Sequence, residues 1–266
     1  MSYSSEVCEH DGEDEVDDVM PEDSEVDEAV DGPQSMVTVE GADNVILKKH
    51  ALLSIDIGVH NLGFAVFYSP DMKQLNEHSF KDIQLTFGIY DTEAHIPKRS
   101  DSIVTGRAYS VKKFLDIIQK QFIIDAIVVE RQINSNTKAM ELMGAFIGCA
   151  VHYTNRLKIF DPKLKFTKIH ETYVTAGKQH KKQSIMYAER VLWTFYRGHL
   201  TDFYACSKRD DYSDAINQGI VYGIDVGLFR GFSLMDYRKV VIDDGNDEKL
   251  RFGATSKQVR GGKGRK

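Results

Sequence analysis

The hydrophobic pattern of the chain changes near residue 44. Before that point Val, Met and Ala are spaced singly among acidic residues, as in EHDGEDEVDDVMPEDSEVDEAVDG, and no apolar periodicity is sustained. A segment of this composition buries too little apolar surface to fold alone. We therefore expect three regions, namely an acidic disordered tail (residues 1–43), a folded domain (44–240) and a basic flexible tail (241–266).

Alternating and β-branched runs predict strands in the folded domain, and apolar residues three or four apart predict helices. The predicted strands are ILKKHALLSIDIG (46–58), LGFAVFYS (62–69), IQLTFGIYD (83–91), IDAIVVERQ (124–132) and KFTKIHE (165–171). The predicted helices cover 102–122, 136–153, 181–197 and 211–224, the last of these ending the fold. The first two strands form a hairpin across a tight turn. This order predicts an α/β protein led by an antiparallel meander.

Length and composition bound the class of protein. The 266 residues, 42% of them hydrophobic, suffice for one good-sized domain or two small ones. No apolar run reaches the roughly 18 residues of a membrane span, and the N-terminus lacks the basic-then-apolar pattern of a secretion signal. The three cysteines form no C-x-x-C pair. We therefore expect no disulfide framework, no zinc site, no membrane contact and a reducing, intracellular compartment.

The net charge of −6 averages two opposite regions. Residues 1–47 contain 16 Asp and Glu and no Lys or Arg, whereas residues 48–266 contain 34 Lys and Arg against 24 Asp and Glu. A basic body is what binding to a phosphate backbone requires, although a solvated surface explains the charge equally well. The acidic tail is expected to compete with DNA phosphates at low salt, unless it serves only solubility or partner binding.

Four carboxylates stand at positions where acids are unusual or paired. Asp56 interrupts a hydrophobic strand, Glu130 ends another strand, and Asp211 and Asp214 open a helix at spacing i, i+3, on one helical face. Each alone has an ordinary explanation, as a turn carboxylate, a solvated strand end, or acids that complement a helix dipole. Together they could converge on one point. Hard oxygen ligands of this kind suit Mg²⁺, and two such ions about 4 Å apart serve phosphodiester hydrolysis.

The ordered set of four blocks resembles the RuvC-like Holliday junction resolvases. The blocks are SIDIGVHNLGFAVF, IVVERQ, the basic KQHKKQ and KRDDYSDA. The likeness covers roughly Leu52 to Ile224 and is nearest to the poxvirus-type branch, which implies DNA recombination and replication of a large DNA virus in the host cytoplasm. It also implies an RNase H-like fold with a mixed five-stranded sheet flanked by helices, and paired symmetric nicks in four-way or other branched DNA. Mg²⁺ would be the cofactor, with Mn²⁺ as a substitute.

Carried over block by block, the resemblance assigns the catalytic, metal-ligating acids to Asp56, Glu130, Asp211 and Asp214. Asp210 offers another register, but it leaves no acid three residues later. The catalytic lysine of the family falls on Lys182 or its neighbour Lys181, either of which could instead make only a non-specific phosphate contact. Gln132 and Asn61 match polar positions of the motifs, as groups that orient the acids or simply as turn and cap residues.

The resemblance further implies a homodimer, because a four-way junction has near two-fold symmetry. The 136–153 helix is the expected interface, since Gly144 and Gly148 would permit close helix approach. The alternative is that these glycines pack on the protein's own sheet.

Three other interpretations fit part of the pattern. The stretch IDIGVHN also resembles the phosphate loop of sugar kinases and actin-like ATPases, but no second Gly-rich loop follows. The acids alone fit another RNase H-like nuclease, acting on RNA–DNA hybrids or as a transposase. A non-catalytic DNA-binding protein would fit the basic body but would need an acid missing, and all four are present.

Overall fold

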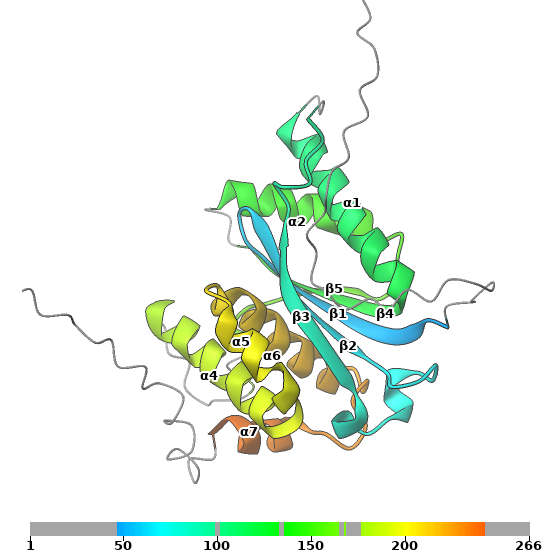
Figure 1. Cartoon of the computed structure of the whole chain (residues 1–266), viewed down its shortest axis with the longest axis vertical. Coiled ribbons are helices and arrows are strands. Elements are labelled where there is room, and N and C mark those ends of the chain that lie inside the picture. Colours follow the sequence, from blue (N-terminus) through cyan, green and yellow to red (C-terminus); the bar gives the residue numbers. More distant parts are fainter. Residues whose placement is uncertain (1–46, 99–101, 133–135, 165–167, 169–176, 243–266) are drawn as a thin grey trace, which may run out of the picture. The chain divides into compact units, whose positions relative to one another are not determined.

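A five-stranded mixed sheet forms the centre of the protein (Figure 1). The computed structural model describes residues 47–98, 102–132, 136–164, 168 and 177–242, which all belong to the unit Val45–Lys266. The predicted acidic tail, and the C-terminal tail beyond residue 242, lie outside the described residues.

The sheet has the strand order β3-β2-β1-β4-β5. The strands are β1 (Lys49–Ile57), β2 (Asn61–Tyr68), β3 (Gln84–Asp91), β4 (Phe122–Glu130) and β5 (Leu157–Phe160). The first three are antiparallel neighbours, whereas β4 pairs parallel with both β1 and β5. This arrangement confirms the predicted α/β class, the antiparallel meander and the mixed five-stranded sheet.

Helices cover both faces of the sheet, and Figure 1 shows them in two layers. One layer consists of α1 (Ile103–Gln121) and α2 (Thr137–Ala150), and the other contains α4 (Gly177–Phe195), α5 (Leu200–Ala205), α6 (Arg209–Asp225) and α7 (Leu234–Ile242). In the second layer α6 packs on β1 and β2, and α4 packs on α6. None of the described helices combines the length and the apolar character that a membrane span requires.

Strand alternation divides the core between these two layers, because successive side chains point to opposite faces. In β1, Leu53, Ile55 and Ile57 join the cluster under α1 and α2, whereas Leu52 joins the cluster under α4, α6 and α7. In β4 the same alternation sends Ile127 and Val129 to the first cluster and Ala126 and Val128 to the second. Each helical layer thus covers an apolar face of the same sheet.

Two predictions about the elements differ from what the structure describes. The fifth strand of the described sheet is the short segment Leu157–Phe160, whereas the predicted strand 165–171 lies outside the described residues except for Lys168. Lys168, the one described member of that segment, sits in a turn and donates its backbone N–H to Leu164. The helix over residues 211–224 is also not the last one, because α7 follows it to Ile242, past the predicted domain boundary at 240.

Candidate metal centre

The ends of β1 and β4 place two acids side by side. Asp56 continues the row of Leu52 and Ser54 on β1 and therefore faces the α6 layer, and Glu130 does the same two residues after Val128 on β4. Ile55 is in register with Val129, so the next position along each strand is Asp56 on β1 and Glu130 on β4. Neighbouring strands are about 4.8 Å apart, which brings these two side chains together.

Helix α6 brings a third carboxylate to the same point. One oxygen from each of Asp56, Glu130 and Asp214 lies within 4.8 Å of the other two. The helix reaches this position because Gly63, the β2 partner of Asp56, has no side chain. A Cβ there would come within 2.5 Å of the Asp211 carbonyl oxygen.

Asp211, the fourth predicted ligand, is not part of this three-acid cluster. It is half-buried one turn before Asp214. Burial raises the pKa of Asp211 above its ordinary value, and the charge of Asp210 raises it further, while Lys181 and Lys208 act in the opposite direction. Asp211 thus lies at the edge of the cluster, in a site that disfavours its charge.

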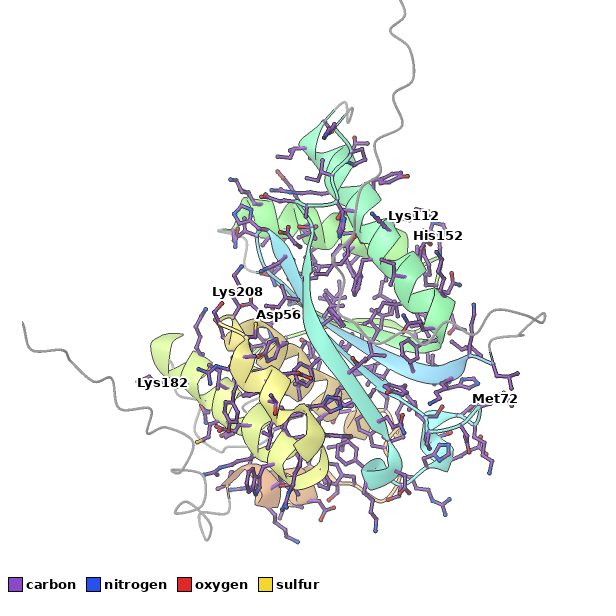
Figure 2. All side chains as sticks on the ribbon, in the orientation of Figure 1. Asp56, Met72, Lys112, His152, Lys182 and Lys208 are labelled. Carbon is purple, nitrogen blue, oxygen red and sulfur yellow. The ribbon has the colours of Figure 1, made fainter. Side chains whose placement is uncertain are left out.

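Of the two candidate lysines, Lys181 interacts electrostatically with the acids at the start of α6. Its ammonium forms an ion pair with Asp210, and this hydrogen bond raises the pKa of Lys181, with smaller contributions from Asp211 and Asp214. Both lysines are exposed, and Figure 2 shows Lys182 at the outer edge of the α4–α6 layer. The Asp210 carboxylate, the alternative register considered above, is the partner of Lys181.

Buried polar side chains that the sequence analysis did not single out are linked to Asp214 by hydrogen bonds. The Ser184 hydroxyl, on α4, donates a hydrogen bond of 2.6 Å to Asp214 Oδ1. Asn217 Nδ2 donates to the Ser184 hydroxyl at 3.0 Å, and the Tyr237 hydroxyl donates to Asn217 Oδ1 at 2.7 Å. The only sequence signal was the polar pair NQ inside the otherwise apolar stretch AINQGIVYGI of α6.

Gln218 fastens α6 to the two strands that carry acids. Its Nε2 donates to the Ser54 hydroxyl and the Ile55 carbonyl at 3.2 Å, and to the Val128 carbonyl at 3.3 Å. These acceptors lie one or two residues before Asp56 and Glu130. Gln218 therefore fixes the position of α6 directly behind the three-acid cluster.

The two other polar motif residues have local roles in the described contacts. The backbone carbonyl of Asn61 accepts the Gly58 N–H at 2.9 Å and closes the β1–β2 turn. A Cβ at Gly58 would come within 2.3 Å of Asn61 Oδ1. The backbone N–H of Gln132 points at the Met143 sulfur at 3.5 Å. For Asn61 these contacts favour the turn-residue interpretation.

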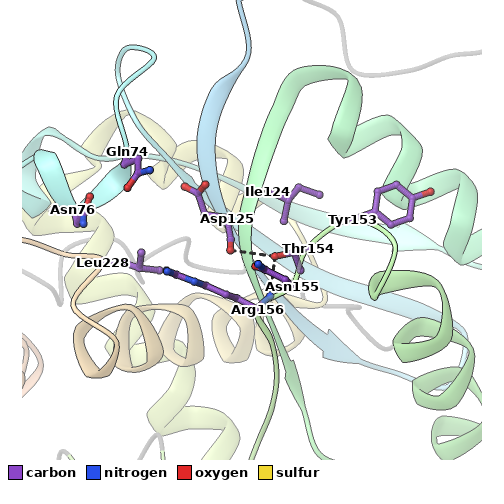
Figure 3. A pocket seen from close by; sticks show the side chains of 9 residues that line it. All are labelled: Gln74, Asn76, Ile124, Asp125, Tyr153, Thr154, Asn155, Arg156 and Leu228. Atoms are coloured by element: carbon purple, nitrogen blue, oxygen red, sulfur yellow. Dashed lines mark hydrogen bonds between the residues drawn. The ribbon is translucent and has the colours of Figure 1, made fainter.

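A polar pocket lies at the other end of the sheet (Figure 3). It has a volume of about 420 Å³. Its lining is Gln74, Asn76, Ile124, Asp125, Tyr153, Thr154, Asn155, Arg156 and Leu228. Asp125 is five residues before Glu130 on β4, about 16 Å away along the strand. This pocket is therefore separate from the three-acid cluster.

The three-acid cluster fits a hard divalent cation. Oxygen ligands of Mg²⁺ stand 2.0–2.1 Å from the ion, so two ligand oxygens of one octahedral ion are roughly 2.9–4.2 Å apart. The three carboxylates offer oxygens within 4.8 Å of one another, from two rigid strands and a helix. Mg²⁺ and Mn²⁺ both accept ligands of this kind.

Solved structures with a similar fold include Holliday junction resolvases. The fowlpox virus resolvase in complex with Holliday junction DNA is 18% identical, with a TM-score of 0.45 over 66% of this chain and 98% of that chain. Thermus thermophilus RuvC is 12% identical, with a TM-score of 0.43 over 67% and 97%. The yeast mitochondrial Holliday junction resolvase Ydc2 is 11% identical, with a TM-score of 0.46 over 75% and 85%. No protein-family model and no curated protein matches the sequence.

Proposed function

We propose that the protein is a divalent-metal-dependent endonuclease that cuts branched DNA, with four-way junctions as its substrate. The observation that carries this proposal is the convergence of Asp56, Glu130 and Asp214 from β1, β4 and α6 within 4.8 Å. Three carboxylates held this close by rigid elements repel one another, and a bound cation would offset this repulsion. The arrangement therefore suits a metal site.

The acids and their surroundings suit phosphodiester hydrolysis. When bound at such carboxylates, Mg²⁺ supplies a water activated for attack and offsets the charge that develops on the phosphate and the leaving oxygen. Asp56, Glu130 and Asp214 would hold the metal. Asp211 would complete the ligand set for a second ion, whose charge would offset the unfavourable burial of its carboxylate.

Basic residues beside the acids suit a phosphate backbone. Lys181 and Lys208 both act electrostatically on Asp211, which places their charges at this end of the sheet. Lys181 would stabilise charge on the attacked phosphate by contacting the substrate in addition to its ion-pair partner Asp210. Lys182, exposed on α4, would contact the backbone further from the cut.

The choice of branched DNA rests on the four sequence blocks, and so does a setting in the recombination and replication of viral DNA. A paired cut on two opposed strands also requires a second active site, and hence a homodimer.

Gly144 and Gly148 support α2 as the interface of this homodimer. They are exposed on the outer side of the helix, and a Cβ at either would meet no atom within 4 Å. They therefore do not pack on the protein's own sheet.

The test is cleavage of a mobile four-way junction, a linear duplex and an RNA–DNA hybrid in Mg²⁺, with the nicks mapped. We expect paired nicks in the junction and little cleavage of the other two. Asp214→Asn should abolish cleavage while junction binding persists, because binding rests on Lys and Arg contacts to phosphate. Asp225→Asn, at the far end of the same helix, is the matched control and should cut normally.

The outcomes separate the candidate functions. Normal cleavage by Asp214→Asn would refute the proposed metal site. Preferential cleavage of the hybrid would point to a nuclease of another substrate class on the same fold. If the wild-type protein cuts none of these substrates and instead hydrolyses ATP, the kinase-like interpretation of the first block is correct.

A further inference from the structure

A continuous chain of buried hydrogen bonds runs from α7, the last helix among the described residues, to the three-acid cluster. The Tyr237 hydroxyl on α7 donates to Asn217 Oδ1 on α6 at 2.7 Å. Asn217 Nδ2 donates to the Ser184 hydroxyl on α4 at 3.0 Å and to the Ser184 carbonyl at 2.8 Å. The Ser184 hydroxyl donates to Asp214 Oδ1 at 2.6 Å. Three helices thus contribute to one polar path that ends on a carboxylate of the cluster.

The hydrogen-bonding capacity of these groups fixes the direction of the chain. The Ser184 carbonyl can only accept, so the group of Asn217 that faces it must be the amide NH₂. The Ser184 hydroxyl accepts from this NH₂, and its single proton is left for Asp214. At the other end, burial raises the pKa of Tyr237 far above its ordinary value, so the phenol keeps its proton and donates. Every link therefore has one donor and one acceptor, and all donors point toward Asp214.

The burial of the chain makes it costly unless every link is formed. Ser184, Asn217 and Tyr237 are each 0% exposed, and they lie among the apolar side chains of α4, α6 and α7. An unsatisfied polar group in such a place costs about 1–3 kcal/mol, whereas an apolar side chain of similar shape would cost nothing of the kind. Apolar residues would serve the packing of these helices at least as well. What they cannot do is hold a carboxylate oxygen.

We propose that Ser184, Asn217 and Tyr237 are positioning residues that fix the Asp214 carboxylate for metal binding, and that α7 acts on the metal site through them. This inference rests on the proposed function, because it takes Asp214 as a metal ligand. The hydroxyl of Ser184 holds Oδ1, which selects one side-chain conformation of Asp214 before the ion arrives. Asn217 aims that hydroxyl, and Tyr237 holds the amide of Asn217 in the orientation that does so.

If these residues orient a metal ligand without contacting the metal, their substitution should cause a graded loss of metal affinity. Removing a partner that orients a ligand costs roughly 10- to 100-fold in metal affinity. Ser184→Ala removes the contact with Asp214 and should lie in this range. Tyr237→Phe removes the hydrogen bond to Asn217, two links before the one that reaches Asp214, and should lower the metal affinity less. Ser184→Thr keeps a hydroxyl at the same place and should restore most of the affinity.

The experiment measures Mn²⁺ binding to the full chain by isothermal titration, alongside the melting temperature of each variant and its rate of junction cleavage. Two control variants each remove a buried serine or tyrosine hydroxyl that does not belong to the hydrogen-bond chain. Ser110, changed to Ala in the first control, is a buried residue of α1 in the opposite helical layer. Tyr196, changed to Phe in the second, directly follows the end of α4. Neither hydroxyl has a hydrogen-bond partner among the described residues. Both controls should bind Mn²⁺ like the wild type.

A double-mutant cycle distinguishes positioning from general destabilisation. If the three residues act in series, Tyr237→Phe should lower Mn²⁺ affinity in the wild type but add nothing once Ser184 is Ala. If they contribute only to packing, the two losses of melting temperature should appear without a loss of Mn²⁺ affinity. A Ser184→Ala variant that binds Mn²⁺ as tightly as Ser110→Ala overturns the inference, and so does a Tyr237→Phe effect that persists in the Ser184→Ala background.

Failure of the proposed function would appear in the wild-type protein. A wild type that binds Mn²⁺ but cuts no nucleic acid would refute the nuclease and leave the positioning chain to be decided by the affinities of its variants. A wild type that binds no Mn²⁺ would refute the metal site and, with it, the positioning chain. A wild type that binds and cuts, with Ser184→Ala unchanged in both, would refute the positioning chain alone.

Discussion

The two ends of strands β1 and β4 each carry acids, but in opposite surroundings. At the amino end, Asp125 on β4 pairs with His50 on β1, with 2.7 Å between Oδ1 and Nδ1. Its backbone carbonyl accepts the Thr154 hydroxyl at 3.1 Å, as Figure 3 shows. At the carboxyl end, Asp56 and Glu130 occupy the corresponding strands, and a further carboxylate, that of Asp214, lies within 4.8 Å of both.

This difference separates a structural acid from a candidate metal ligand. An acid next to an imidazole has a partner that can share a proton or carry the opposite charge, so the pair is satisfied within the protein. Three acids within 4.8 Å of one another gain from a cation supplied from outside. An aspartate in a strand is therefore not informative by itself. The group that the fold brings against it decides what the aspartate can do.

Neutralising one acid at each end of β4 tests whether the two ends differ in function. Glu130→Gln removes a carboxylate of the cluster. It should lower junction cleavage by more than the roughly 10- to 100-fold that a merely orienting residue costs. Asp125→Asn, its matched control on β4, should cut at the wild-type rate. It should melt earlier, because it loses the pairing with His50.

The measurements are single-turnover cleavage rates at saturating Mg²⁺ and melting temperatures without added metal. A large loss of cleavage in Asp125→Asn, with its melting temperature unchanged, would mean that the polar pocket in Figure 3 takes part in the reaction. Wild-type cleavage by Glu130→Gln would show that the convergence of acids has no catalytic consequence.

Local patterns were sufficient to predict four of the five strands and the two strand-borne acids. Asp56 and Glu130 stand out because each interrupts or ends a β-branched run, and the alternation of that run also determines the face of the sheet on which the acid lies. The short strand Leu157–Phe160 was missed because four residues carry almost no periodicity. Its place in the sheet depends on pairing with β4, which is a property of the fold and not of the segment.

The last helix did leave a signal in the sequence. Ser233 and Asp236 form a reciprocal cap, in which each side chain accepts the backbone N–H of the other. The spacing S-x-x-D before an apolar run is a recognised mark of a helix start. By contrast, nothing in the sequence links Ser184, Asn217 and Tyr237. Their contact depends on how three helices pack, which local patterns do not specify.

The two adjacent lysines show the same limit and provide a second test. Neighbouring residues on a helix point about 100° apart, so the choice between Lys181 and Lys182 depends on the rotation of α4. In the structure both side chains are exposed, but Lys181 pairs with Asp210 beside the cluster, and Lys182 lies at the outer edge of the layer. Lys181→Met should therefore lower the maximal cleavage rate roughly 10-fold or more, as loss of a charge that stabilises the attacked phosphate does.

Lys182→Met is the matched control for this change. It should leave the maximal rate near that of the wild type and weaken junction binding slightly, with a smaller salt dependence, as expected for one lost phosphate contact. Rate against substrate concentration at two salt concentrations measures both effects. The reverse result, with the larger loss of maximal rate in Lys182→Met, would exclude Lys181 as the lysine of the site.

The smallest expected effect concerns the stability of the metal-free protein and involves Asp211. The pKa of Asp211 is raised by burial and by the charge of Asp210, so the folded protein holds this proton to higher pH than the unfolded chain does. The ionised carboxylate therefore destabilises the metal-free fold at neutral pH, and stability increases as the pH falls through the raised pKa. Asp211→Asn removes this charge and should melt slightly above the wild type at pH 7 without divalent ions.

The pH and metal dependence of that difference decides its cause. The gap in melting temperature between Asp211→Asn and the wild type should close below about pH 3, where the carboxyl is protonated in both states. Saturating Mg²⁺ should narrow or reverse it, because the ion stabilises only a protein that binds it. Asp125→Asn should show the opposite sign at pH 7, since its carboxylate has an imidazole partner. If both variants melt below the wild type at pH 7, the charge of Asp211 is satisfied within the protein, and the contrast between the two ends of the sheet does not extend to this residue.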